Sequence, residues 1–381
     1  MPSSILSPEA LRHALAVRDL TDPAQGPHAV QLVLTTAVEA LSDAWRCAVV
    51  LERAHPIVSI ADNYDLLRYP PEAAARDARY TRYVAADRLL RSQTSAMIPP
   101  LLRRLAPAPP EDALLVCPGI VYRRDAIDRL HTGEPHQVDL WRVRRAPPLG
   151  PDDLREMIRI VAGAVAPGRA LRLTQAVHPY TLGGLQLDVA ARPGEPASDG
   201  HLEIGECGLA HPEVLAGAGL PPAWTGLAMG LGLDRLVLLA KGLDDLRLLR
   251  SDDPRIARQL VDLSPWRPVS RHPPVRRDLS VAVDAAADAE TLGDRVREAL
   301  GPRAVDVEAI EVRSETAYDA LPGTARARLG IHPGQKNVLL RLVLRAVGRT
   351  LTDREANLLR DAVYGAVHEG TAYEWAAAPA G

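Results

Sequence analysis

Apolar and polar residues repeat along the first 260 residues with two different periods. Residues 28–43 carry apolar side chains at helical spacing, which predicts an amphipathic helix. Residues 151–166 repeat this spacing after two aspartates, which favour the first turn of a helix. Short apolar or alternating runs predict strands at 47–51, 113–122, 136–143, 170–177, 185–191 and 202–205.

Three further segments divide the chain. Residues 1–27 have a mixed pattern that ends in prolines and a glycine, and we expect a loosely structured lead-in there. Residues 226–241 are apolar and glycine-rich and should end as a buried helix. Four prolines give residues 263–275 the composition of a linker, so we place a domain boundary there.

The C-terminal residues 276–381 have a different order of elements. Their pattern predicts strand, helix, strand, strand, helix and a short last strand near Tyr373. This split βαβ order is typical of a small ferredoxin-like domain. The predicted fold class is therefore α+β, with a larger domain over residues 28–262 and a smaller one at the C-terminal end.

Phenylalanine is absent from all 381 residues, although it is one of the side chains that usually dominate cores. Only two of the 45 basic residues are lysines, so coding bias is one explanation. Such bias would not readily remove every phenylalanine, so a functional explanation stays open.

Charge and cysteine content exclude several classes of protein. The formal net charge of -3 gives no global reason for nucleic-acid binding, although a basic patch could exist locally. The three cysteines are too widely spaced for a disulfide framework or a zinc site. No apolar run approaches 18 residues and no secretory signal begins the chain, so we expect a soluble cytoplasmic protein with no membrane partner.

Charged side chains gather on a predicted hairpin. Residues two apart in a strand share a face, so Arg123 and Asp125 project together, as do Gln137 and Asp139 on the returning strand. An arginine fork suits phosphate, and a carboxylate suits an ammonium group. The alternative is an exposed charged hairpin without a ligand.

Glycines mark a second candidate segment. Gly226, Gly230 and Gly232 precede Arg235, and glycines let a backbone approach a flat ligand closely. The alternative is a tightly packed core helix whose arginine lies at the surface.

Together, these two segments resemble motifs 2 and 3 of class II aminoacyl-tRNA synthetases, and their surroundings resemble phenylalanyl-tRNA synthetases. The matching stretches are residues 63–67, 90–97, 121–128, 136–139, 202–208 and 230–235. The C-terminal domain resembles the ferredoxin-fold anticodon-binding domain of the same enzymes. The resemblance covers roughly residues 33–375 in a single-chain arrangement, and it implies a class II synthetase-type antiparallel sheet flanked by helices.

The resemblance implies a ligase that activates an amino acid with ATP and Mg²⁺ and passes it to tRNA. By this resemblance, Arg123 binds the α-phosphate of ATP and Arg235 binds the far end of the same molecule. Each acts as a fixed positive charge. Asp125 contacts the adenine side, and Gly232 belongs to the ATP site. Glu203 matches a carboxylate that ligates Mg²⁺, an ion that prefers oxygen donors.

The resemblance also implies an amino-acid site. Its positions are Gln93, Ser95, Gln137, Asp139, His178, Tyr180, Ala228 and Gly230. Ser95, Gln137 and Asp139 match contacts to the amino-acid head group, and Ala228 limits the side-chain pocket at the far end of the ring. For Ser95 alone, a helix cap is the alternative.

The chain departs from the family at four places. Gln93 stands where the family has His, Pro135 where it has Phe, and Asp139 where it has Glu. His178 and Tyr180 replace the two Phe rings that wall the side-chain pocket. A buried imidazole or phenol without a hydrogen-bond partner costs about 1–3 kcal/mol of binding free energy, and a Phe side chain cannot supply that partner. We therefore expect an altered or relaxed amino-acid preference. The alternative is that Tyr180 turns its hydroxyl to water and phenylalanine remains the substrate.

The lack of phenylalanine therefore includes positions in the implied active site. One hypothesis is that the chain lacks phenylalanine so that it can be translated when Phe-charged tRNA is scarce, for instance as a back-up or resistance enzyme. Compositional bias is the alternative.

The acceptor and the partners are less constrained by the sequence. Residues 276–381 hold 14 basic and 16 acidic residues, a formal charge of -2, which is unusual for an RNA-docking domain. Arg341, Arg345 and Arg349 could still form a basic patch, or a solvated face. We expect tRNA as acceptor and a monomer or homodimer without a separate β-subunit. Two other functions stay open: an adenylate-forming paralogue with a non-tRNA acceptor in biosynthesis, and an inert relative that only binds amino acid or RNA.

Overall fold

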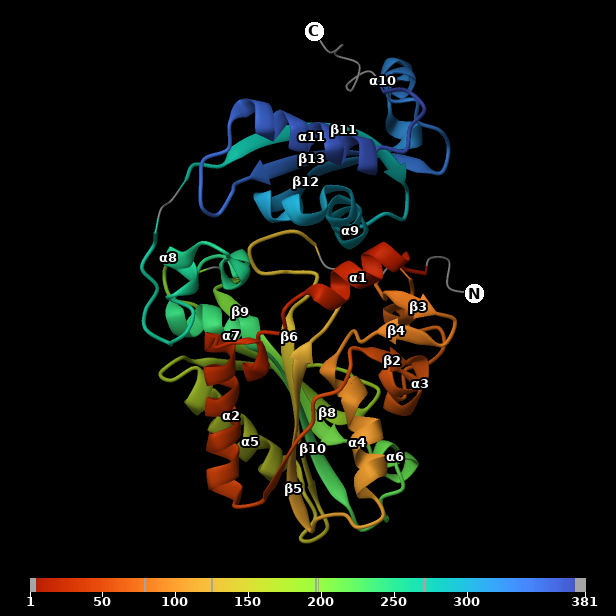
Figure 1. Cartoon of the computed structure of the whole chain (residues 1–381). Coiled ribbons are helices and arrows are strands. Elements are labelled where there is room, and N and C mark those ends of the chain that lie inside the picture. The colour runs from red at the N-terminus through yellow and green to blue at the C-terminus, as the bar shows by residue number, and fades with distance from the viewer. Residues whose placement is uncertain are drawn as a thin grey trace. The chain divides into compact units, whose positions relative to one another are not determined.

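The computed structural model describes residues 5–373, except residues 79, 125, 196, 198, 270 and 271. The chain forms two compact units, coloured along the chain in Figure 1. The first unit comprises Met1–Arg123, Glu134–Leu249 and Arg255–Arg267, and the second comprises Arg124–Gly133, Arg250–Pro254 and Pro268–Gly381. No helix among the described residues is long and apolar enough to cross a membrane.

A seven-stranded sheet with the order β1-β5-β6-β10-β9-β8-β7 forms the centre of the first unit. Among the described strands, β1 and β5 pair in parallel and the other neighbours in this sheet are antiparallel. The strands are β1 (Ala48–Leu51), β5 (Asp112–Ile120), β6 (His136–Arg144), β7 (Leu171–Gln175), β8 (Thr181–Ala190), β9 (His201–Ala210) and β10 (Thr225–Gly232). The predicted antiparallel sheet flanked by helices is confirmed.

Helices cover both faces of this sheet (Figure 1). On one side lie α2 (Ala29–Trp45), α5 (Pro151–Val165) and α7 (Leu233–Lys241), and on the other lie α4 (Ile98–Leu105) and α6 (Pro212–Gly217). Because both faces are covered, the interior strand β5 is buried at almost every position rather than at alternate ones. The predicted helices at 28–43 and 151–166 are confirmed as α2 and α5.

One predicted strand is longer in the structure, and one predicted segment contains a strand before its helix. The strand predicted at 202–205 extends to Ala210, because glycines in this segment permit close strand packing instead of ending the strand. The prediction that the apolar segment at 226–241 ends as a buried helix is confirmed by α7, and the first half of the segment forms the strand β10.

A small sheet and its adjoining turns were not predicted. It consists of β2 (Ile57–Ser59), β4 (Arg88–Leu90) and β3 (Tyr83–Ala85), and α3 (Ile60–Asn63) follows its first strand. Strands of three residues are too short to show a period. After β4, the turn η4 (Thr94–Met97) leads directly into α4.

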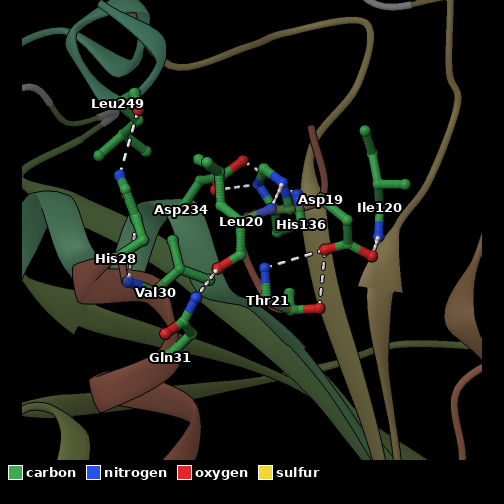
Figure 2. Close-up of polar contacts among 10 residues, drawn as sticks. All are labelled: Asp19, Leu20, Thr21, His28, Val30, Gln31, Ile120, His136, Asp234 and Leu249. Carbon is green, nitrogen blue, oxygen red and sulfur yellow. Dashed lines mark hydrogen bonds and ion pairs between the residues drawn. The ribbon is translucent and has the colours of Figure 1, made fainter. Parts of the chain in front are cut away.

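The described part of the lead-in, residues 5–27, is ordered, so the prediction of a loose segment is wrong there. It forms α1 (Pro8–Ala16), which Ser7 caps by accepting from the backbone N–H of Ala10. Leu20 and Thr21 are buried, and the Leu20 N–H donates to Nε2 of His136 over 3.0 Å (Figure 2). Tertiary contacts with β5 and β6, which no local pattern reports, hold this segment in place.

The second unit contains a three-stranded antiparallel sheet in the order β11-β13-β12. Its elements are β11 (Val275–Asp284), α9 (Ala289–Leu300), β12 (Val307–Ala317), α10 (Gly323–Leu329), β13 (Gln335–Leu344) and α11 (Asp353–Val367). The elements follow the predicted order strand, helix, strand, strand, helix through α11, with α10 as an addition. The ferredoxin-like assignment stays a prediction. The strand predicted near Tyr373 is not formed by residues 371–373, and residues 374–381 lie outside the described part.

The chain is irregular on both sides of the boundary between Arg267 of the first unit and Pro268 of the second, as the proline content there predicts. A short helix, α8 (Pro254–Ala257), precedes it, and the described residues from 258 to 274 form neither helix nor strand. The linker predicted at 263–275 therefore ends where β11 begins.

His28 is a buried neutral group at the start of α2. Its Nδ1 accepts from the Val30 N–H over 3.2 Å, and its Nε2 lies 3.1 Å from the Leu249 carbonyl oxygen (Figure 2). A ring nitrogen that accepts cannot carry a proton, so protonation would break the cap of α2. Burial lowers the pKa of His28 from 6.5 to about 4.

We expect the free energy of unfolding to fall as pH drops from about 6.5 to about 4, because the unfolded chain then binds a proton that folded His28 excludes. The loss should reach at most about 3 kcal/mol. Urea unfolding of the wild type and of His28→Gln across this pH range measures it. The variant should lose this part of the pH dependence, and equal slopes for both proteins would contradict the assignment.

Candidate active site

Three neighbouring strands bring the predicted site residues together on one face of the large sheet. Side chains of directly paired residues point to the same face. The pairs that build this face are Trp141–Ala228, Asp139–Gly230 and Gln137–Gly232 between β6 and β10, and Gly230–Glu206 between β10 and β9. Two carboxylates, Asp139 and Glu206, therefore flank a position that has no side chain.

The Asp139 carboxylate is buried and fully engaged with the protein. It accepts from the Thr94 hydroxyl over 2.7 Å, from the Ser95 hydroxyl over 2.9 Å and from Nε1 of Trp141 over 3.0 Å. Thr94 and Ser95 reach it from η4. Burial raises the pKa of Asp139, and these hydrogen bonds oppose that effect. The structure thus joins Ser95 and Asp139 to each other, two residues predicted to contact the amino-acid head group.

Gln137 and Gln93 have different surroundings. Gln137 lies at the start of β6, and its side chain makes no hydrogen bond within the described residues. Gln93 donates from Nε2 to the Asn63 carbonyl over 2.9 Å, and its Oε1 accepts from the Tyr69 hydroxyl over 3.3 Å. Gln93 therefore helps to hold the ring of Tyr69 in place. Burial raises the pKa of the Tyr69 hydroxyl to about 12.

Four aromatic rings gather above this sheet face. The Tyr180 ring lies 6.1 Å from Trp141 at an angle of 18°, 6.2 Å from Tyr69 and 5.5 Å from the His178 ring, all between centroids. Tyr180 also packs against the apolar cluster that includes Ala228. The residues predicted to wall the side-chain pocket are thus assembled in one place, and burial raises the pKa of Tyr180 well above its ordinary value.

His178 forms an ion pair that the sequence did not predict. Its Nε2 lies 2.7 Å from Oε2 of Glu206, and this bond raises the pKa of His178. Glu206 lies on β9, 28 positions further along the chain, so no local pattern links the two residues. Pairing of β8 with β9 and the turn between β7 and β8 bring them together.

A β-bulge decides which carboxylates of β9 share a face. Strand alternation would place Glu203 and Glu206 on opposite faces. The register between β8 and β9 shifts between Gly205 and Glu203, and both glutamates are partly exposed while their neighbours on either side are buried. Glu203 therefore lies on the same face as Glu206.

The predicted ATP residues lie at the end of this face. The Arg123 Nε donates to the Ser92 carbonyl over 3.1 Å, and within the described residues its guanidinium forms no ion pair with a carboxylate. Arg235, in the first turn of α7, donates to the Glu203 carbonyl oxygen and lies 3.3 Å from Oε2 of Glu203. Gly232 is the residue before α7. The predicted site residue Asp125 lies outside the described residues.

The three arginines for which the sequence left a basic patch or a solvated face open are each paired with a carboxylate. Arg341 pairs with Asp278 over 2.8 Å, Arg345 with Glu308 over 2.7 Å, and Arg349 with Glu355 over 2.8 Å. These pairs leave little net positive charge at the three positions.

Close contact between β9 and β10 requires a glycine at position 205. A Cβ atom there would lie 2.1 Å from the Gly230 carbonyl oxygen, which is backbone and cannot move aside. We expect Gly205→Ala to lower the free energy of unfolding by more than about 2 kcal/mol, or to prevent folding. Gly163→Ala on α5 is the control, because its Cβ would meet nothing within 4 Å. It should be neutral or stabilise by up to about 1 kcal/mol.

Thermal and urea unfolding compare the two variants with the wild type. A Gly205→Ala protein as stable as the wild type would show that the strands can separate at this point without cost.

Comparison with known proteins identifies the family of this fold. Residues 28–260 match the model of the tRNA synthetases class II core domain (F). Three relatives are phenylalanine–tRNA ligase alpha subunits. The one from Lactobacillus delbrueckii subsp. bulgaricus is 35% identical over 205 residues, which is 52% of this chain and 58% of that protein. The one from Prochlorococcus marinus (strain MIT 9313) is 33% identical over 244 residues, 63% of this chain and 69% of that protein. The one from Bacillus pumilus (strain SAFR-032) is 30% identical over 235 residues, 59% of this chain and 67% of that protein.

The chain spans between 58% and 69% of the length of these three relatives. The family model covers well over half of the chain and contains every strand of the large sheet. The chain belongs to the phenylalanine–tRNA ligase family and is built on the class II tRNA synthetase core.

Proposed function

We propose that this chain is an aminoacyl-tRNA ligase that activates an aromatic amino acid with ATP and transfers it to tRNA. The observation that carries the proposal is Arg123. Its partly buried guanidinium is held by Ser92 and has no carboxylate partner among the described residues. Burial raises the pKa of Tyr69 to about 12, and the positive charge of Arg123 opposes part of this rise, so that charge acts near the aromatic cluster. A fixed cation next to an amino-acid site is what adenylate formation needs.

In this proposal, a carboxylate oxygen of the amino acid attacks the α-phosphorus of ATP, and pyrophosphate leaves. Negative charge increases on the phosphate oxygens in the transition state, and a positioned guanidinium stabilises it without reorganisation. Arg123 takes this role, and Arg235 binds the far end of ATP. The carboxylate of Glu203, next to Arg235, limits the net positive charge there.

Glu203 is also the residue that would hold Mg²⁺. The described residues contain no group of three or more His, Cys, Asp or Glu side chains that could bind a metal ion by itself. The Glu203 carboxylate is partly exposed, and proteins often bind Mg²⁺ through one or two carboxylates together with the phosphates of the nucleotide. When bound, the ion would neutralise charge on the leaving pyrophosphate.

The amino acid would lie over Gly230, where the sheet face lacks a side chain. Gln137 would bind its head group, because it lies on this face opposite Gly232 and its amide makes no hydrogen bond within the described residues. The rings of Tyr69, Tyr180 and Trp141 favour an aromatic side chain.

Transfer to tRNA, without a separate subunit, is the remaining part of the proposal. Transfer to tRNA is supported by the relatives, which are phenylalanine–tRNA ligase alpha subunits. The part of the proposal that dispenses with a separate subunit is supported by the second folded unit in the same chain. The purified chain should esterify total tRNA by itself. Adenylate formation without esterified tRNA would favour a different acceptor.

We expect Arg123→Gln to reduce amino-acid-dependent pyrophosphate exchange by about 10²- to 10³-fold, because it removes one fixed charge from the transition state. The control is Arg145→Gln, which breaks an exposed ion pair with Glu111 at the other end of β6 and should change the exchange rate little. Exchange with labelled pyrophosphate and a panel of aromatic amino acids measures both. Equal activity of Arg123→Gln and the wild type would contradict the proposed role.

A further inference from the structure

The Glu206–His178 pair lies where an aromatic substrate would be bound, but no step of the proposed reaction uses it. The two side chains are 36% and 18% exposed, so ligand binding would remove the water that they still contact. The pair neighbours the Tyr180 ring, 5.5 Å from that of His178, and Glu206 acts electrostatically on Tyr69 and Tyr180. Glu206 also flanks Gly230 on the sheet face.

Glu206 has hydrogen-bonding capacity that Asp139, on the other side of Gly230, lacks. Three side-chain donors already bind the Asp139 carboxylate. Within the described residues, His178 is the side chain that reaches the Glu206 carboxylate, through Oε2. An ionised carboxylate can accept several hydrogen bonds. Glu206 can therefore accept a further donor from a ligand.

An unsubstituted phenyl ring is a poor match for this pair. It would exclude water from the ion pair and offer no hydrogen bond in return, which disfavours binding. A ring that carries a donor would replace the lost water at Glu206. Sites that hydrogen-bond a substrate group discriminate strongly against the analogue without it.

We propose that the Glu206–His178 pair selects an aromatic amino acid whose ring carries a hydrogen-bond donor, such as a phenolic hydroxyl or a ring amino group. This inference rests on the proposed function, and it names the substrate class of that site. Glu206 accepts from the ring donor, His178 holds Glu206 in place as a positioning residue, and the rings of Tyr180 and Trp141 bind the aromatic plane.

Pyrophosphate exchange with matched substrates tests the proposal. The substrates are L-phenylalanine, L-tyrosine, L-meta-tyrosine, and 3-amino- and 4-amino-L-phenylalanine. We expect at least one donor-bearing ring to exceed phenylalanine by about tenfold or more in kcat/KM. Glu206→Ala should reduce this ratio to about one, and His178→Phe with Glu206→Ala should favour phenylalanine. The control is Glu111→Gln, which removes an exposed carboxylate just before β5, at the end of the sheet away from the site. This variant should preserve the ratio.

Two outcomes would overturn the proposal. Phenylalanine could be the best substrate of the wild type. Alternatively, Glu206→Ala could raise KM equally for every amino acid, which would assign Glu206 to the α-ammonium group instead of the ring.

A binding measurement separates this inference from the proposed function. If the chain supports no exchange with any amino acid, the proposed ligase activity fails. Isothermal titration of the same five amino acids still tests the site: tighter binding of a donor-bearing ring, lost in Glu206→Ala, supports the inference. Equal binding of all five would overturn it.

Discussion

The hydrogen-bonded carboxylate of Asp139 is the interaction on which the candidate site depends. A carboxylate buried in a sheet is stable only when donors replace its water. Thr94, Ser95 and Trp141 supply them, which ties η4 and α4 to the face of β6. The same contacts fix the indole that packs against Tyr180. Because Asp139 is committed to the protein, the remaining polar groups of this face, Gln137 and Glu206 among them, are the ones available to a ligand.

The absence of phenylalanine has a physical consequence for the core. Among the largest fully buried side chains, the aromatic ones are Trp141, Tyr64 and Tyr122, and each carries a polar atom into the interior. The Tyr64 hydroxyl donates to the Ala75 carbonyl over 2.6 Å, and that of Tyr122 donates to the Ala14 carbonyl over 3.3 Å. Tyr122 thereby helps to hold α1, so the aromatic composition also contributes to the order of the N-terminal segment. Whether the lack of phenylalanine serves translation stays a hypothesis.

Much of the fold could be predicted because its signals are local. The helices α2 and α5 have clear apolar periodicity, and β5 and β6 have apolar runs bounded by polar or proline-rich residues. The tertiary structure then places the motif residues of β6 and β10 in direct register. Prediction was poorer where local signals are weak: the three-residue strands β2, β3 and β4 are too short, and α1 owes its position to partners more than 100 residues away.

The sequence by itself determined the class of fold, the antiparallel strands of the first unit and the family to which the motifs belong, because spacing and residue type are local properties. Only the tertiary structure decided which polar groups meet. The bulge in β9 places Glu203 and Glu206 on one face against simple alternation. Strand pairing then brings Glu206 to His178, and η4 brings Ser95 to Asp139. These contacts join residues far apart in the chain, and the balance between burial and hydrogen bonding selects them once the sheet has formed.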